Sequence, residues 1–273
     1  MTLNNTINIQ SLAQKIRIHA TRMISAAKSS HLGGNFSMAE IIAVLYGKIL
    51  NVSPENIDDP NRDRFILSKG HAAAGYYATL AECGFFPIDW LDQFYVDGGK
   101  LAGHATRGIA GIEVSSGALG HGLPMAVGMA LAAKRDKKSY KIYVLLSDGE
   151  CNEGSVWEAA MLAAQHQLDN LICIVDYNKI QALGYTKDIC DLEPFAEKWK
   201  AFRWNVCEVN GHNIDELIET FTKIPLEKNK PNCIIAHTVK GKGVSFMEDQ
   251  LLWHYRSPQD DEYKNAIKEL QEF

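Results

Sequence analysis

The amino-acid sequence predicts an α/β fold with a mainly parallel sheet and helices on both of its faces. The first observation is order: from residue 141 onward, short β-rich apolar runs alternate with helical patterns, as in parallel-sheet proteins. The second is composition, since runs such as Leu171-Ile172-Cys173-Ile174-Val175 are apolar at every position and suit strands covered on both faces. Ligands of such sheets bind at the carboxyl ends of the strands, so the polar residues there are candidates for a site.

The first third of the chain is predicted to be mostly helical. Apolar residues recur at helical spacing over residues 9–27. The capping-box pattern Ser37-Met38-Ala39-Glu40 predicts that a second helix starts there and runs through the apolar residues 41–50. Residues 64–67 are expected to form a short strand, and residues 72–83 the helix behind it.

A glycine-rich stretch, residues 98–128, separates this part from the alternating part. It holds nine of the 21 glycines, which predicts tight turns or a close approach to a ligand. A helix is expected to resume over residues 123–134. The remaining elements are predicted as strands at 141–146, 171–175, 205–209 and 233–239, and helices at 156–167, 194–202 and 214–223.

Composition excludes several classes of protein. The 28 basic and 33 acidic residues give a net charge of −5, so there is no basic footprint for nucleic acid. The sequence contains no run of about 18 apolar residues, so it predicts no membrane span. The start, MTLNNTINIQ, lacks the features of a signal peptide, and the six cysteines show no CxxC spacing. A cytoplasmic protein with reduced thiols is therefore expected.

Polar residues follow two predicted strands that are neighbours in sequence. Asp148 comes directly after the strand that ends at Leu146, and Asn178 follows the one that ends at Val175. They lie 30 residues apart, one βαβ unit, so adjacent parallel strands would bring both oxygens to one crevice. A carboxylate plus a carboxamide suits Mg²⁺, and Gly149 would let a backbone N–H approach a diphosphate. Either motif alone could also be an ordinary loop turn.

These residues resemble the thiamine diphosphate signature, a GDG run followed about 30 residues later by Asn, with Ser147 in place of the first glycine. Further blocks are similar to transketolases and stand in the same order. They are Ser30-His31-Leu32-Gly33, residues 62–71, Gly103-His104, residues 116–122, residues 168–171 and Tyr177-Asn178-Lys179-Ile180. The resemblance covers nearly the whole chain.

The resemblance implies a single domain over residues 1–273, the thiamine diphosphate-binding N-terminal domain of transketolase. It further implies an enzyme subunit that helps to transfer a two-carbon ketol unit from a ketose or ketose phosphate to an aldose. The expected partner is a C-terminal subunit with the pyrimidine-binding domain and its activating glutamate, which no part of this chain matches. Self-association as a dimer, or a heterotetramer of two copies of each subunit, is expected. The substrates are sugars or sugar phosphates, with no nucleic acid or membrane partner.

The resemblance also assigns roles to individual residues. It implies that Asp148, Asn178 and the Ile180 carbonyl bind Mg²⁺, or Ca²⁺ or Mn²⁺ in its place. It implies that four histidines act on the substrate and cofactor, namely His31, His71, His104 and His254. The residues implied to contact thiamine diphosphate are His71, Gly117, Leu119, His121, Gly149, Glu150, Glu153 and Asn178.

Several alternatives stay open at the level of sequence. A lone histidine is more often a satisfied polar residue than a catalyst. Residues 240–243 follow a predicted strand and could contact anions, although their lysines are expected to be solvated. The apolar helices over residues 123–133 and 156–164 could form a subunit interface or only cover the sheet of this chain. The function could also be that of a specialised split enzyme acting on an unusual sugar, or of a non-catalytic binding homologue. The donor and acceptor sugars are left undetermined.

Overall fold

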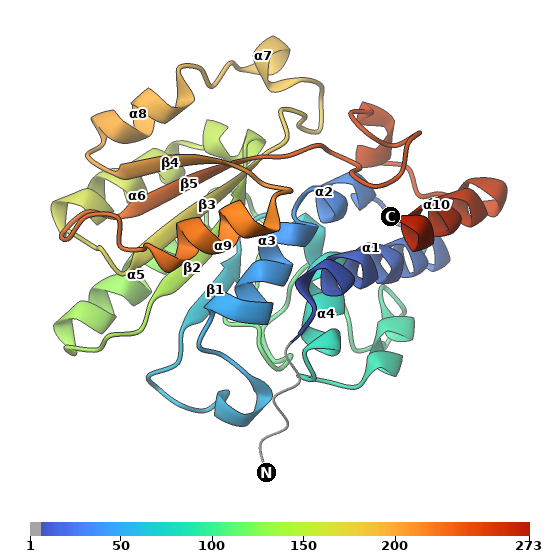
Figure 1. The fold of residues 1–273 in the computed structure, drawn as a ribbon, viewed down its shortest axis with the longest axis horizontal. Coiled ribbons are helices and arrows are strands. Elements are labelled where there is room, and N and C mark those ends of the chain that lie inside the picture. The colour runs from blue at the N-terminus through green and yellow to red at the C-terminus, as the bar shows by residue number, and fades with distance from the viewer. Residues whose placement is uncertain (1–6) are drawn as a thin grey trace.

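A parallel five-stranded sheet forms the centre of the computed structural model, which describes residues 7–273 (Figure 1). The strands lie in the order β1-β2-β3-β5-β4, and every neighbouring pair is parallel. Their bounds are β1 Arg64–Leu67, β2 Ile142–Ser147, β3 Leu171–Tyr177, β4 Asn205–Asn210 and β5 Asn232–His237. The predicted fold class is confirmed.

Alternate strand residues face two separate hydrophobic cores. In β2, Tyr143 and Leu145 belong to one core, whereas Val144 and Leu146 belong to the other. The first core includes residues of α1 (Ile9–Ala26), α2 (Leu32–Ser37), α3 (Ala39–Val44), α4 (Ala73–Glu82), α9 (Ile214–Thr222) and α10 (Asp260–Glu272). The second includes residues of α5 (Gly122–Arg135), α6 (Gly154–Gln165) and α8 (Phe195–Ala201). Because both faces are covered, residues 171–175 of the central strand β3 are all apolar and buried.

One predicted helix start is wrong. The chain is already helical in α2, and α3 begins at Ala39 after Met38, without a side-chain cap. The hydroxyl of Ser37 donates instead to the Asp176 carboxylate at 2.5 Å and lies 3.2 Å from the Gly34 carbonyl oxygen. The Ser37 side chain therefore binds Asp176, a buried residue distant in sequence, and does not form the local helix-capping bond that the pattern predicts.

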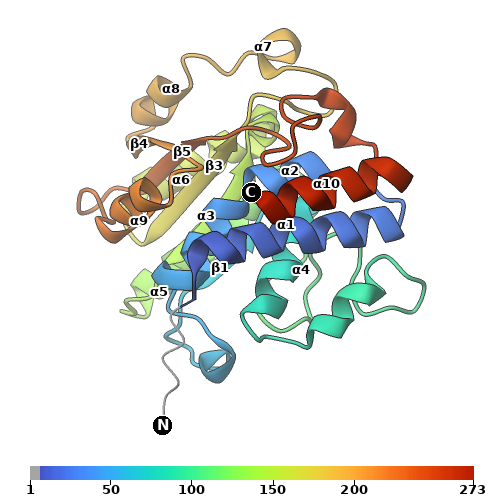
Figure 2. The same ribbon diagram turned by 45° about the vertical axis from the view of Figure 1, so that its right-hand side comes forward.

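The helix α10 was not predicted and packs along α1. Figure 2 shows the two side by side, and the Gln14 side chain donates to the Leu270 carbonyl at 2.9 Å. A short helix, α7 (Thr186–Ile189), lies in the connection between β3 and α8. The six cysteines all fall within the described residues and are free. Among residues 7–273, no helix is both long and apolar enough to cross a bilayer.

The strand register brings the expected polar residues to the same edge of the sheet. Ser147 at the end of β2 pairs with Asp176 near the end of β3, and Tyr177 pairs with His237 of β5. Asp148 and Asn178 follow directly, so one βαβ unit delivers both to neighbouring positions. The strands that contain Leu146 and Val175 are parallel neighbours, as predicted.

Candidate active site

A cleft of about 280 Å³ lies at the carboxyl ends of the strands and brings together most of the predicted site residues. The three predicted metal ligands, Asp148, Asn178 and Ile180, line it. The four predicted histidines and three further predicted cofactor-binding residues line it as well: His31, His71, His104, His254, Gly117, Leu119 and Gly149. One concave site thus collects residues that are spread over more than two hundred positions of the chain.

Asp148 is buried and has few groups to balance its charge. Its carboxylate accepts two backbone hydrogen bonds, from the Gly149 N–H at 2.6 Å and from the Lys179 N–H at 2.5 Å. Burial, followed by repulsion from Asp176, raises its pKa to about 6. A carboxylate in such surroundings favours a bound cation, because a cation restores the charge balance.

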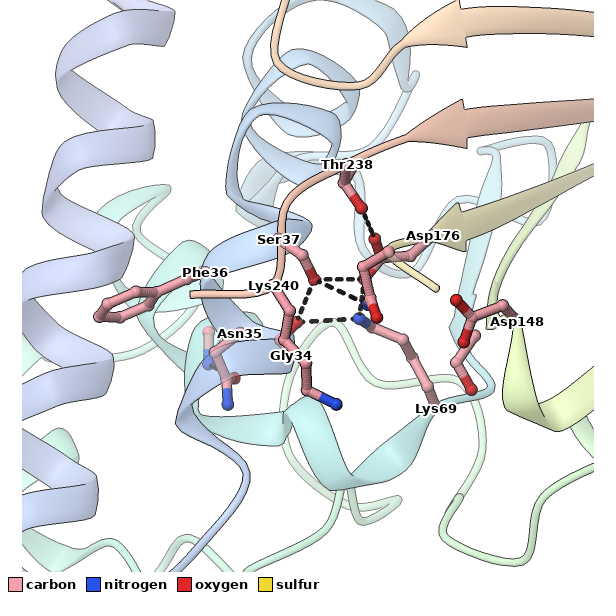
Figure 3. A network of polar contacts seen from close by, with 12 residues as sticks. Gly34, Asn35, Phe36, Ser37, Lys69, Asp148, Asp176, Thr238 and Lys240 are labelled. Carbon is pink, nitrogen blue, oxygen red and sulfur yellow. Dashed lines mark hydrogen bonds and ion pairs between the residues drawn. The ribbon is translucent and has the colours of Figure 1, made fainter. Parts of the chain in front are cut away.

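Asp176 sits beside Asp148 but is fully compensated (Figure 3). Its carboxylate accepts hydrogen bonds from Ser37 of α2 and from Thr238 after β5, and it forms an ion pair with Lys69 after β1. Burial alone would raise its pKa, but the Lys69 charge and these hydrogen bonds lower it. The network joins four segments beneath the cleft and contributes a fixed negative charge next to Asp148.

Lys240 supplies a second buried cation, against the expectation that it is solvated. Its ammonium donates to the Ile180 carbonyl at 2.8 Å and to His254 Nδ1 at 2.7 Å. Burial lowers its pKa to about 8, although the Asp148 charge acts in the opposite direction. The available signal was the position of Lys240 directly after Val239, the last residue of the predicted strand.

The histidine cluster surrounds His31. The ring centroid of His31 lies 5.2 Å from that of His71, 6.4 Å from His104 and 5.1 Å from His254. His31 has left-handed backbone geometry, with φ of 76°, and its N–H donates to the His254 carbonyl at 2.8 Å. Asn35 holds the same residue from the other side by donating to the His31 carbonyl at 2.8 Å. A strained backbone fixed by two partners is typical of a functional position.

Most of these imidazoles are neutral near pH 7. Burial, the neighbouring His104 and the Lys240 charge lower the pKa of His31 to about 4. Burial and Lys240 lower that of His254 to about 3, and burial and Lys69 lower that of His71 well below its usual value. A neutral imidazole has one donor and one acceptor nitrogen, so the cluster can both give and receive hydrogen bonds.

Gly149 allows a close approach of two loops at the floor of the cleft. A Cβ on this residue would lie 2.8 Å from Gln181 Cβ, so any larger side chain would push the loop after β3 away. Asn178 in that loop accepts the Ile180 N–H at 3.1 Å, which orients its side-chain oxygen. The glycine therefore keeps the two loops that carry the predicted metal ligands in contact.

Three residues that the resemblance assigns to the cofactor do not line this cleft. Glu150 is buried under the glycine-rich loop, where its carboxylate accepts from the Gly120 N–H at 2.8 Å and from Ser68. Glu153 is exposed at the start of α6, and His121 is exposed at the start of α5. Glu150 positions the loop that carries Gly117 and Leu119; a direct cofactor contact by Glu150, Glu153 or His121 stays a prediction.

The donor set of the cleft fits the implied groups. Asp148, Asn178 and the Ile180 carbonyl offer only oxygen ligands, which suit Mg²⁺ or Ca²⁺ better than a soft metal. Two buried lysines, Lys69 and Lys240, provide positive charge of the kind a diphosphate needs. The buried Asp148 carboxylate, which has two backbone N–H donors, is compatible with such a cation.

Comparison with known proteins agrees with this chemistry. Residues 8–271 match the family described as "Transketolase, thiamine diphosphate binding domain". The chain is 43% identical over 267 residues to one subunit of the apulose-4-phosphate transketolase of Phocaeicola vulgatus, and the match covers 98% of this chain and 94% of that protein. It is 41% identical to the 6-deoxy-6-sulfo-D-fructose transketolase subunit SqwG of a Clostridium species, and this match covers 97% of each chain.

Solved structures show the same fold. The crystal structure of transketolase from Campylobacter jejuni superimposes with a TM-score of 0.90 and 31% sequence identity. The match covers 96% of this chain but 42% of that one. The similarity is therefore to one portion of a long transketolase chain and to nearly the whole length of the Phocaeicola and Clostridium proteins.

Proposed function

The chain belongs to the transketolase family, and from this premise we propose that it forms the diphosphate- and metal-binding half of a two-subunit enzyme for ketol transfer. The observation that carries the proposal is the convergence, in one cleft, of three oxygen ligands, two buried lysines and four histidines. The relatives with subunit names, matched over nearly their full length, support the division into two subunits.

We assign the metal to Asp148, Asn178 and the Ile180 carbonyl. A divalent cation there would neutralise Asp148 and would take over the carbonyl that Lys240 now contacts. Lys240 and Lys69 would then attract the diphosphate oxygens. Thiamine diphosphate, when bound, supplies the nucleophilic carbon and the electron sink that no amino-acid side chain provides.

The histidines would act on oxygen atoms of the sugars. One neutral imidazole accepts the proton of the donor hydroxyl at C3 as the bond between C2 and C3 breaks. In the second half of the reaction, an imidazole returns a proton to the aldehyde oxygen of the acceptor as the new bond forms. His254 accepts from Lys240 through Nδ1, so the proton of its neutral ring lies on Nε2, and that nitrogen can donate to a substrate oxygen.

We propose that the donor is a specialised ketose with an anionic end group and not one of the common ketose phosphates of central sugar metabolism. The named substrates of two relatives, apulose 4-phosphate and 6-deoxy-6-sulfo-D-fructose, both carry such a group. For this chain, the assignment is tested by comparing a panel of ketose phosphates and sulfonates as donors with a common aldose acceptor.

A reconstitution experiment tests the function itself. The purified chain is assayed for ketol transfer with thiamine diphosphate and Mg²⁺, first alone and then with a partner that carries the pyrimidine-binding domain. We expect turnover only in the mixture and a complex that contains two copies of each subunit. Full turnover by this chain alone would contradict the two-subunit proposal, and cofactor binding without turnover in any mixture would support a non-catalytic role.

A further inference from the structure

A second cavity adjoins the histidine cluster. Its volume is about 310 Å³, and it shares His31, His71, His104 and Tyr255 with the cleft but none of the predicted metal ligands. The histidines are therefore common to both cavities, whereas Asp148 lines only the first. A substrate whose reacting carbonyl is held by the histidines would place its more distant carbons there.

Tyr95 forms one wall of this cavity and has an unusual backbone. Its φ of 59° lies in the left-handed region, and its side chain is 61% exposed. Its ring rests on Gly103: a Cβ on Gly103 would lie 2.1 Å from the ring carbon Cε2. A bulky residue with positive φ is uncommon, and an exposed aromatic ring gains little from the protein itself, so this placement is costly unless a ligand uses it.

Tyr255 also lines this cavity. Its side chain is 58% exposed, and its ring centroid lies 4.8 Å from that of His254 and 6.5 Å from that of His31. Among the described residues, it is the one besides the histidines that lines both cavities. A tyrosine in this position offers an apolar ring face together with a hydroxyl.

We propose that Tyr95 and Tyr255 are specificity-determining residues that pack against the carbon chain of the aldose acceptor beyond its first two carbons. The rings contact its C–H groups. The inference rests on the proposed ketol transfer and deepens it, because it assigns to this chain a part in choosing the acceptor. It implies that acceptors of four or more carbons use this cavity, whereas a two-carbon acceptor does not reach it.

The test compares a short acceptor with a long one in the reconstituted enzyme at saturating donor. The short acceptor is glycolaldehyde and the long one is D-erythrose 4-phosphate. In Tyr255→Ala and Tyr95→Ala, we expect kcat/KM for the long acceptor to fall about tenfold, because each loses the contact area of one aromatic ring. For glycolaldehyde, the change should stay below about twofold, because no stacked carbon is lost.

Control variants separate the tyrosine rings from other effects. Tyr95→Gly removes the ring while it relieves the positive φ, so it should behave as Tyr95→Ala even where the alanine disturbs the loop. Phenylalanine at either position should retain most of the activity with the long acceptor. Tyr140 lies just before β2 with the Arg64 side chain over its ring. Tyr140→Ala should leave kcat/KM unchanged for both acceptors. The affinity for thiamine diphosphate, measured by calorimetry with Mg²⁺, should be unchanged in every variant.

The outcomes distinguish this inference from the proposed function. Equal losses with both acceptors, or no loss with the long one, would overturn the role of the tyrosines while leaving ketol transfer intact. A wild-type mixture that transfers no ketol unit to either acceptor would instead overturn the proposed function, and the acceptor assignment with it.

Discussion

Two neighbouring aspartates, Asp148 and Asp176, differ in how their charges are balanced. Asp176 has an ion pair with Lys69 and two hydroxyl donors, whereas Asp148 has two backbone N–H donors and lies near the Asp176 charge. The pKa of Asp148 is accordingly raised to about 6, while that of Asp176 is lowered. We therefore expect Asp148 to destabilise the cofactor-free fold, and under the proposed function it would stabilise a bound cation.

Asp148→Asn should separate these two effects. Without cofactor, we expect the free energy of unfolding at pH 7 to be unchanged or to rise by about 1–2 kcal/mol, because a poorly compensated buried charge is removed. Mg²⁺-dependent binding of thiamine diphosphate should be lost. Denaturant unfolding and calorimetry measure the two quantities. Cofactor affinity equal to that of the wild type would contradict the assignment of Asp148 as a metal ligand.

A pH dependence follows from Glu40, a buried carboxylate away from the cleft. Arg17 of α1 donates to it at 2.7 Å, and His212 before α9 lies at 2.9 Å. Burial would raise its pKa, but Arg17 and His212 lower it to about 2. A pKa below its unfolded value means that the stability is fully present above about pH 4.5 and is lost as pH falls toward 2.

Glu40→Gln should therefore lower the free energy of unfolding by about 3 kcal/mol at pH 6, which corresponds to the pKa shift of the wild-type carboxyl. The difference between wild type and variant should shrink steadily between pH 4.5 and pH 2. Urea unfolding of both proteins across this range measures it. A difference that does not change with pH would show that shape, and not charge, accounts for the loss.

At the scale of elements, the turn after β5 determines which lysine side chain faces the cleft. Lys240 and Lys242 stand two residues apart in the same glycine-flanked turn. Lys240 is buried and contacts Ile180 and His254, whereas Lys242 is partly exposed and pairs with Glu248 at 3.2 Å. The two lysines form a matched pair in which only one faces the cleft.

Lys240→Met should weaken binding of thiamine diphosphate by about a hundredfold, because a charge-assisted contact to the diphosphate is worth roughly 2–3 kcal/mol. Lys242→Met should change the affinity by less than about twofold, since an exposed ion pair contributes little. Calorimetric titration with Mg²⁺ present compares the two. If both variants bind thiamine diphosphate with equal affinity, Lys240 does not contribute to diphosphate binding.

At the scale of the whole molecule, the second core leaves part of α6 uncovered. Its inner residues, such as Val156 and Ala160, are fully buried against the sheet, whereas Met161 and Leu162 are 52% and 47% exposed. Together with Phe202, they line a groove between α6 and α8. The interpretation that this helix covers the sheet is confirmed for its inner face. The subunit interface stays a prediction, and it concerns the exposed face.

Leu162→Glu should weaken assembly while leaving the fold stable. A charged residue in a closed interface is costly, whereas an exposed substitution usually changes stability by about 0.5 kcal/mol or less. Mass measurement in solution, with and without the partner subunit, tests this, and Leu226→Glu on the loop before β5 is the control, since Leu226 is also partly exposed. Unchanged assembly in Leu162→Glu would exclude this face of α6 from the interface.

The sequence by itself determined the class of fold, the order of its strands along the chain and the pairing of Asp148 with Asn178. These follow from local patterns, because a strand covered on both faces must be apolar throughout and parallel strands end at the same edge. The same rule marked residues after Val239, yet it could not tell the buried Lys240 from the partly exposed Lys242. That difference depends on which side of the turn meets the loop after β3.

The tertiary structure alone decided how charges are balanced and which side chains share a cavity. Ser37 looked like a helix cap but serves Asp176, which lies 139 residues away. Likewise, Tyr95 and Tyr255 come from distant segments of the chain and line the same cavity as His31. Such contacts have no local signature, because burial and long-range packing determine them, and the pKa of Asp148 and the walls of the second cavity depend on these contacts.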